Sequence, residues 1–175
     1  MSAPVTIRPV APEDLRAITA IYAHAVEHGT ASFEIEAPGE AEMAARQESL
    51  VNGGFPYLVA ETGGRIAGYA YTGPYRPRVA YRFTLEDSVY VHPRAQGHGI
   101  GRLLLTDLIA QAEARGFRQM IAVIGDSAQL PSIALHRSLG FVPVGTLSNI
   151  GFKHDRWLDS VLMQRALGEG ATTAP

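Results

Sequence analysis

The stretch that decides the fold is VYVHPRAQGHGIGRLLLTDLIAQAEARG, residues 89–116. It begins as an apolar strand, passes through a loop with glycine at positions 97, 99 and 101, and continues directly into a leucine-rich helix. Alternate glycines let successive backbone N–H groups point the same way without interference from Cβ atoms. The start of the helix adds unpaired N–H donors and the positive end of its dipole. The stretch therefore predicts a site for a diphosphate-bearing ligand.

Two common phosphate-binding motifs are absent from this loop. The dinucleotide fingerprint G-x-G-x-x-G requires glycine at position 102, where the sequence has Arg102. The P-loop requires Gly-Lys, and the only lysine is Lys153. A tight strand-to-helix connection needs one glycine, so three alternate glycines favour a ligand. Arg102, in the first helical turn, can add a charge-assisted hydrogen bond.

Length and composition indicate one α/β domain over residues 1–166, followed by a flexible tail at 167–175. The balance of 15 basic and 17 acidic residues, net −2, gives no electrostatic footprint for nucleic acid. The chain has no cysteine, which excludes disulfides, thiolate metal sites and a cysteine nucleophile. No apolar run reaches the length of a signal peptide or of a membrane span, so we expect a cytoplasmic protein without membrane contact.

Hydrophobic periodicity and turn residues predict seven strands and four helices. The strands are expected over 5–10, 56–61, 66–71, 84–92, 119–124, 141–149 and 157–164. The helices are expected over 12–28, 40–51, 130–139 and from the glycine loop to about 115. The order β-α-α-β-β-β-α-β-α-β-β predicts a mixed α/β layer fold.

The strand TLEDSVYVH, residues 84–92, carries a carboxylate where a core residue is expected. Alternation places Thr84, Glu86, Ser88, Tyr90 and His92 on one face, and Leu85, Asp87, Val89 and Val91 on the other. Asp87 then lies among aliphatic side chains, which is costly unless it is paired. A β-bulge near 87–88 would turn it elsewhere, and bulges often lie beside active sites. We therefore predict a bulge there.

Motifs along the chain resemble one enzyme family. The pattern Gln/Arg-x-x-Gly-x-Gly/Ala after a strand is the acetyl-CoA pyrophosphate motif of the GCN5-related N-acetyltransferases (GNAT), and Gln96, Gly99 and Gly101 match it. TLEDSVYVHP, GHGIGRLLL, SIALHRSLGF and GFKHDRWLDSVLMQ resemble the phosphinothricin and methionine sulfoximine acetyltransferase branch, over about residues 5–166. The resemblance implies the GNAT fold: a mixed, mostly antiparallel sheet of about seven strands, helices on both faces, and splayed central strands.

The same resemblance implies acetyl-CoA as co-substrate, no metal, and a homodimer. Backbone groups of residues 89–91 would pair with the pantetheine arm and place an N–H near the thioester oxygen, although Val-Tyr-Val can equally be an ordinary buried strand. Gln129 stands where the branch usually has an asparagine that contacts coenzyme A. The expected cofactor-binding residues are Val89, Tyr90, Val91, Gln96, Gly97, His98, Gly99, Ile100, Gly101, Arg102 and Gln129.

Two residues are candidate catalysts by resemblance. Glu86, together with Thr84, matches the family's Thr-x-Glu motif, which implies a general base that takes a proton from the substrate ammonium. From the sequence alone, a surface carboxylate at a strand end is the simpler interpretation. His136 stands where the wider superfamily commonly has a tyrosine that protonates the leaving thiolate. His136 could be that acid, or it could orient the acceptor.

The Pro/Arg-rich segment YRPRV is implied to form the substrate loop. Its guanidinium groups offer a bidentate fork for a carboxylate, phosphinate or sulfoximine oxygen, whereas the alternative is a solvated basic loop. The expected substrate-binding residues are Phe33, Glu34, Arg76, Pro77, Arg78, Thr84, Leu85 and Glu86. His24 and His28 have a spacing that can chelate a metal, but no third ligand is apparent, so they are interpreted as exposed histidines near a helix end. Lys153 and Trp157 lie in a matched segment without a role.

The resemblance implies an N-acetyltransferase that acetylates the α-amine of phosphinothricin, methionine sulfoximine or methionine sulfone by direct attack in a ternary complex. The same fold acting on a protein N-terminus or a polyamine is the first alternative. A non-catalytic acyl-CoA sensor is the second, and a nucleotide-binding module the third. Arg76 and Arg78 favour a small anionic acceptor over a protein N-terminus or a polyamine.

Overall fold

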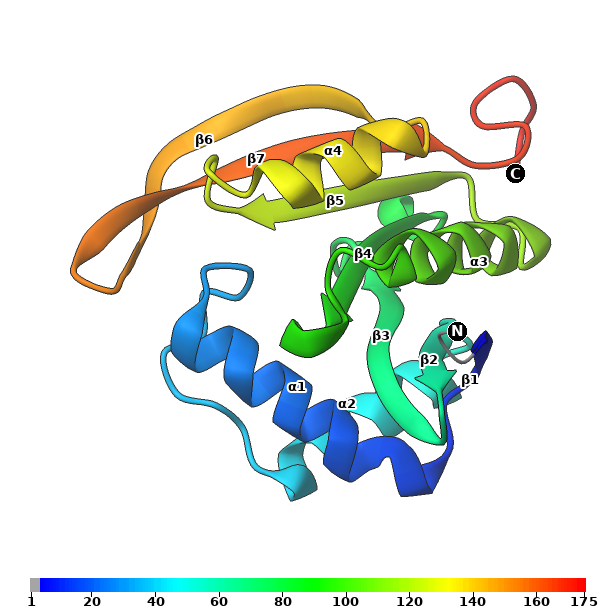
Figure 1. Ribbon diagram of the computed structural model, residues 1–175. Coiled ribbons are helices and arrows are strands. Elements are labelled where there is room, and N and C mark those ends of the chain that lie inside the picture. Colours follow the sequence, from blue (N-terminus) through cyan, green and yellow to red (C-terminus); the bar gives the residue numbers. More distant parts are fainter. Residues whose placement is uncertain (1–3) are drawn as a thin grey trace.

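The computed structural model describes residues 4–175 as a seven-stranded sheet with helices on both faces (Figure 1). Residues 1–3 of the expected domain lie outside the described residues. The strands are β1 (Val5–Pro9), β2 (Tyr57–Thr62), β3 (Arg65–Pro74), β4 (Thr84–Val91), β5 (Gln119–Gly125), β6 (Val142–Lys153) and β7 (Arg156–Ala166). The helices are α1 (Leu15–His28), α2 (Glu40–Asn52), α3 (Ile100–Ala114) and α4 (Leu130–Ser138). The predicted element order and fold class are confirmed.

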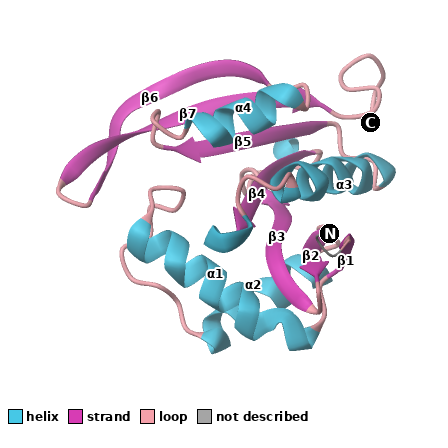
Figure 2. Ribbon diagram, viewed as in Figure 1, coloured by secondary structure: helices cyan, strands magenta, loops and turns pink. Residues whose placement is uncertain are grey.

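The sheet opens between its two central strands. Its order is β1-β2-β3-β4-β5-β7-β6, and every pair is antiparallel except β4 with β5 (Figure 2). The parallel pair joins only Thr84–Asp87 to Gln119–Ala122. Beyond it, β4 continues to Val91 against β3 alone, while β5 continues to Gly125 against β7 alone. The predicted splay of the central strands is therefore confirmed.

The predicted bulge near 87–88 is wrong. The register between β3 and β4 runs without a shift from Gly68 opposite Val91 to Pro74 opposite Leu85. The Asp87 side chain points into the core because it pairs there with His136 of α4, with 2.9 Å between His136 Nε2 and Asp87 Oδ2. One carboxylate oxygen is thus paired within the core, so the side chain stays inward without a bulge.

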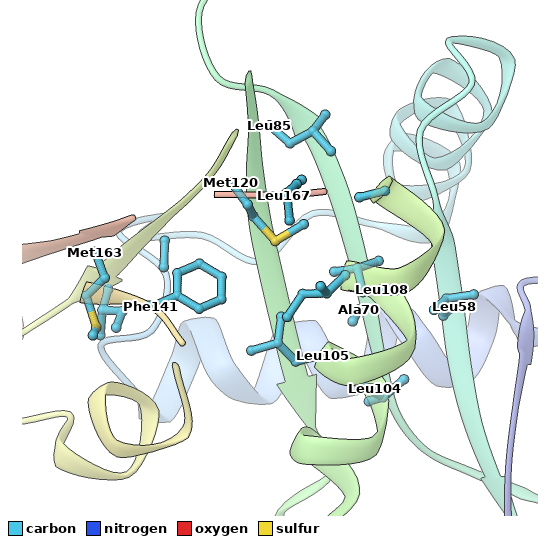
Figure 3. Close-up of a cluster of buried hydrophobic side chains, with 14 of the residues drawn as sticks. Leu58, Ala70, Leu85, Leu104, Leu105, Leu108, Met120, Phe141, Met163 and Leu167 are labelled. Carbon is cyan, nitrogen blue, oxygen red and sulfur yellow. The ribbon is translucent and has the colours of Figure 1, made fainter. Parts of the chain in front are cut away.

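Strand alternation divides the core into two layers. Leu58 and Val59 are neighbours in β2 but pack on opposite faces, because successive strand residues point to opposite sides. One layer lies under α3, where Leu104, Leu105 and Leu108 belong to the same buried cluster as Met120 of β5 (Figure 3). The other layer lies under α1 and α2, with members Ile18, Ile21, Tyr22, Val26, Met43, Tyr57, Val59 and Tyr69. The predicted faces of β4 agree, since Leu85 joins the first layer and Tyr90 packs on the second.

The last strands form an apolar edge. β6 is the outermost strand and exposes Val142, Val144, Ile150 and Phe152, with Trp157 of β7 beside Phe152. The homodimer stays a prediction, for which this edge is the candidate surface. Leu167, the first residue of the expected tail, is fully buried in the core, so the packed region extends beyond 166. No helix within residues 4–175 combines the length and the apolar character needed to cross a membrane.

Candidate active site

A groove of about 500 Å³ is bordered by β4, the glycine loop, α4 and the end of α1. The predicted cofactor-binding residues that line it are Val89, Tyr90, Val91, Gln96, Gly97, Gly99, Ile100, Gly101, Arg102 and Gln129. His98 is not part of the lining, and its Nδ1 lies 2.8 Å from the carbonyl oxygen of Gln96. Ile100 buries its side chain in the core, so it can offer only backbone atoms to the groove.

Glycine is required at the three positions 97, 99 and 101 for different structural reasons. Gly97 and Gly99 adopt φ of 77° and 79°, in the left-handed region that other residues enter at a cost. A Cβ at either position would meet no atom within 4 Å. Gly101 has an ordinary φ, but a Cβ there would lie 3.3 Å from Leu135 of α4. The loop thus leaves open space before the first turn of α3, while Gly101 lets α3 and α4 approach each other.

A Gly99→Ala substitution is expected to lower the free energy of unfolding by about 1–2 kcal/mol, the usual cost of a left-handed residue with a Cβ. Urea denaturation measures this loss. The added Cβ would meet no atom within 4 Å, so the loss reports only the cost of the backbone conformation. Gly39→Ala is the matched control, since that glycine has φ of −78° and no atom within 4 Å of the added Cβ. Equal losses in the two variants would contradict the backbone explanation.

A small chamber of about 60 Å³ lies in the opening between β4 and β5, next to the groove. Asp87, Ser132 and His136 line it, together with the backbone of β4 and β5. His136 Nε2 lies 2.9 Å from Asp87 Oδ2, and His136 Nδ1 lies 2.8 Å from the Ser132 carbonyl oxygen. The His136 and Asp87 side chains are 5% and 1% exposed. Burial lowers the pKa of His136, but the hydrogen bond and charge of Asp87 outweigh it, so the pKa is raised overall.

Glu86 lies on the other face of β4, within the part of the strand that pairs with β5. Strand alternation separates its side chain from Asp87, and it lies on the same face as Ser88, on the side of α1 and α2. The pKa of Glu86 is raised, first by burial and then by the charge of Asp87, while Arg76 acts to lower it. A carboxyl group with a raised pKa is a stronger base than an ordinary glutamate once it is ionised, which suits proton transfer. The two predicted catalysts therefore lie on opposite faces of β4, and His136 is the one that lines the chamber.

Phe33 and Glu34 lie in the loop after α1, which the C-terminal hairpin holds in place. The Phe33 ring lies against Gly125 of β5 and Gly151 of β6, so that a Cβ on either glycine would overlap it. Lys153, which is 4% exposed, donates from Nζ to the Ser32 carbonyl oxygen at 2.8 Å. Burial lowers the pKa of Lys153.

Glu34 is engaged within the protein. It accepts hydrogen bonds from Tyr22 at 2.9 Å and from Arg46 at 2.6 Å. Burial raises the pKa of Glu34, but Arg46 and Tyr22 outweigh this effect and the pKa is lowered overall. Glu34 is therefore held as a carboxylate that fixes the loop to α1 and α2.

The other predicted acceptor residues are only partly brought together. Arg76 lies near enough to Glu86 to act on its charge, and its guanidinium stands 5.2 Å from the Tyr75 ring centre. Pro77 and Arg78 are exposed on the same connection. Thr84 instead lines a separate cavity with Tyr75 and Tyr81. The Leu85 side chain is fully buried in the core, away from any acceptor.

Sequence reasoning missed two contributions to the site. It treated Asp87 as a misplaced carboxylate, although its position among core residues was itself the signal of a buried partner. It also set aside His24 and His28, which line the groove with their rings stacked 4.5 Å apart. Nothing in the helical spacing distinguishes a groove-facing histidine from a solvated one.

Within the described residues, no group of three or more His, Asp or Glu side chains is placed to hold a metal ion.

Comparison with known proteins identifies the family. The model of the acetyltransferase (GNAT) family matches residues 18–141. The chain belongs to this family. Its GNAT fold is similar to the crystal structure of a phosphinothricin acetyltransferase from Sinorhizobium meliloti in complex with AcCoA, with a TM-score of 0.95, 50% identity, and coverage of 98% of this chain and 92% of that one.

Two curated relatives of this GNAT chain carry specific names. Phosphinothricin N-acetyltransferase of Alcaligenes faecalis is 56% identical over 170 residues, which cover 97% of this chain and 86% of the relative. The L-methionine sulfoximine/L-methionine sulfone acetyltransferase of Salmonella typhimurium is 42% identical, over 95% of this chain and 97% of the relative. This GNAT protein is therefore similar, over almost its whole length, to acetyltransferases named for phosphinothricin and for methionine sulfoximine and sulfone.

Proposed function

We propose that the protein transfers the acetyl group of acetyl-CoA to the α-amine of a small amino-acid analogue of the phosphinothricin or methionine sulfoximine type, by direct attack in a ternary complex. The observation that carries the proposal is the opening between β4 and β5, where the chamber that His136 lines adjoins the groove, while Glu86 lies on the other face of β4. The likeness to the Alcaligenes faecalis and Salmonella typhimurium enzymes supports the choice of acceptor.

The groove supports binding of the acyl carrier by backbone groups. The N–H groups at residues 97–101, at the positive end of α3, are suited to the diphosphate. Val89 and Val91 lie beyond the last pair with β5, so their backbone groups have no β5 partner and suit pairing with an extended pantetheine arm. The Val91 carbonyl oxygen already accepts a bond of 3.4 Å from Gln96 Nε2, which shows that it faces away from β3. A backbone N–H of β4 then suits the thioester oxygen as negative charge develops on it.

The chemistry follows from the two faces of β4. Glu86 takes one proton from the acceptor ammonium, and the neutral amine attacks the thioester carbon. The C–N bond forms, the nitrogen gives its second proton to solvent, and the C–S bond breaks with its electron pair on sulfur. His136 supplies the proton that makes the thiol and is reprotonated from solvent. The products are the N-acetylated acceptor, coenzyme A and one proton released to solvent. Arg76, near Glu86, is suited to the acceptor's carboxylate or phosphinate.

A thiol-release assay with acetyl-CoA across acceptors tests the proposal. We expect turnover with phosphinothricin, methionine sulfoximine and methionine sulfone, and a kcat/KM at least about tenfold lower with methionine, which lacks the added oxygen for a charge-assisted bond. A polyamine and a peptide N-terminus serve as matched amine controls. Faster turnover of either control would overturn the choice of acceptor, and coenzyme A binding without thiol release from any amine would overturn the enzyme.

A further inference from the structure

The contacts of His136 determine where its protons lie. Nδ1 is 2.8 Å from the Ser132 carbonyl oxygen, and a carbonyl oxygen only accepts, so Nδ1 carries a proton. Nε2 is 2.9 Å from Asp87 Oδ2. If Nε2 and Asp87 were both deprotonated, a lone pair would face a buried carboxylate. One further proton therefore lies between Nε2 and Oδ2, and the pair holds two protons in all.

The surroundings of the pair favour the imidazolium form of His136. The other oxygen of Asp87, Oδ1, is buried and has no hydrogen-bond partner among the described residues. Phe141 covers the imidazole with its ring centre at 5.0 Å, and Glu86 lies on the opposite face of β4. Asp87 is thus the charged group that contacts His136, and loss of the shared proton would leave its buried charge uncompensated. The raised pKa of His136 agrees with this arrangement.

Ser132 connects this pair to the groove. Its hydroxyl oxygen lies 3.5 Å from His136 Nδ1, one helical turn away on α4. Ser132 lines both the groove and the chamber, whereas Asp87 and His136 line only the chamber. The hydroxyl is therefore the member of the group that can meet a ligand in the groove. Asp87, His136 and Ser132 form a line from the core to the groove.

We propose that Asp87, His136 and Ser132 form a proton relay to the sulfur that leaves during acetyl transfer, with Asp87 as a positioning residue. This inference rests on the proposed function. As the C–S bond breaks, the Ser132 hydroxyl gives its proton to sulfur and takes the Nδ1 proton of His136. His136 is left neutral with its proton on Nε2, where it still donates to Asp87. One proton from solvent then restores the imidazolium.

Asp87→Asn tests the positioning role, because the amide keeps the size of the side chain and can donate to Nε2. His136 then becomes neutral with its proton on Nδ1, and giving that proton away would leave an imidazolate. We expect kcat to fall about tenfold with an unchanged KM for acetyl-CoA. The high-pH limb of the kcat profile, where the wild type loses the imidazolium, is expected to move to lower pH. Ser132→Ala is expected to lower kcat by a similar factor without moving that limb.

Nitrogen-15 NMR of the histidine rings gives a readout that does not depend on turnover. The His136 signals are assigned by their loss in His136→Gln, and we expect both ring nitrogens to be protonated in the wild type at pH 7 and one in Asp87→Asn. Asp107→Asn, on α3 and outside both the groove and the chamber, is the matched control and is expected to leave rates and spectra unchanged. A neutral His136 ring in the wild type, or a wild-type kcat in either Asp87→Asn or Ser132→Ala, would overturn the relay. If the wild type releases no thiol, the proposed function fails, while the spectra still test the protonation of the pair.

Discussion

Glu86→Gln is expected to lower kcat/KM for the acceptor by about 10²- to 10⁴-fold, the usual contribution of a general base. Only the carboxylate can take the ammonium proton, so the wild-type rate rises as pH increases through the pKa of Glu86. Burial and the charge of Asp87 raise that pKa, which places this acidic limb above the range of an ordinary glutamate. Glutamine cannot ionise, so the variant is expected to lose the limb together with the rate.

The pH dependence of kcat/KM in wild type and variant measures this effect, with calorimetry for acetyl-CoA as the second readout. The affinity for acetyl-CoA is expected to be unchanged, because Glu86 does not line the groove. Glu48→Gln on the exposed side of α2 is the matched control. A rate within a few-fold of wild type, with the acidic limb still present, would remove Glu86 from the role of base.

Most of the fold could be predicted because the sequence marks its own turns. The hairpin between β2 and β3 turns at Gly63 and Gly64, which adopt φ of 54° and 72°, and this glycine pair predicts the turn directly. The hairpin between β6 and β7 turns at His154 and Asp155, with φ of 51° and 56°. Neither residue is a glycine, so the prediction ended the first strand at 149, before β6 ends at Lys153, and began the second at 157, one residue after β7 begins. Left-handed residues other than glycine give only a weak sequence signal.

The candidate site was predictable in its backbone part and less so in its side chains. The glycine loop and the start of α3 are contiguous in sequence, so their joint geometry follows from local rules. The pairing of Asp87 with His136 joins residues 49 positions apart. It depends on how α4 packs over the open end of β4, which no local pattern contains. The wrong prediction of a bulge has the same origin. A carboxylate at a core position can be turned outward by a bulge or paired within the core, and the sequence does not reveal which of the two occurs.

Displacement of the Phe33 ring is expected to have the second large effect on activity. The position of this ring depends on the absence of a side chain at Gly151. A Cβ there would lie 2.4 Å from Phe33 Cε2, well inside van der Waals contact. The ring is 36% exposed, so it can swing away where a buried ring could not. Lys153 donates a hydrogen bond to the carbonyl oxygen of Ser32, the residue before Phe33. Displacement is therefore expected to move the Phe33 side chain while the loop backbone stays attached.

Gly151→Ala is accordingly expected to lower kcat/KM for the acceptor by about 10²-fold, the scale of a misplacement of about 1 Å in a site that positions its substrate. Kinetics with varied acceptor at saturating acetyl-CoA measure the loss, and the KM for acetyl-CoA is expected to stay the same. Gly145→Ala on the same strand is the matched control, because its added Cβ meets no atom within 4 Å.

A double-mutant cycle then separates the ring from the strand. In Phe33→Ala the ring that the added Cβ at position 151 would overlap is gone. Adding Gly151→Ala to this variant is therefore expected to lower kcat/KM no further, so the two effects are non-additive. Losses that simply add would mean that Gly151→Ala acts by distorting β6 rather than by moving Phe33. Equal activity of Gly151→Ala and Gly145→Ala would mean that Phe33 does not wall the acceptor site at all.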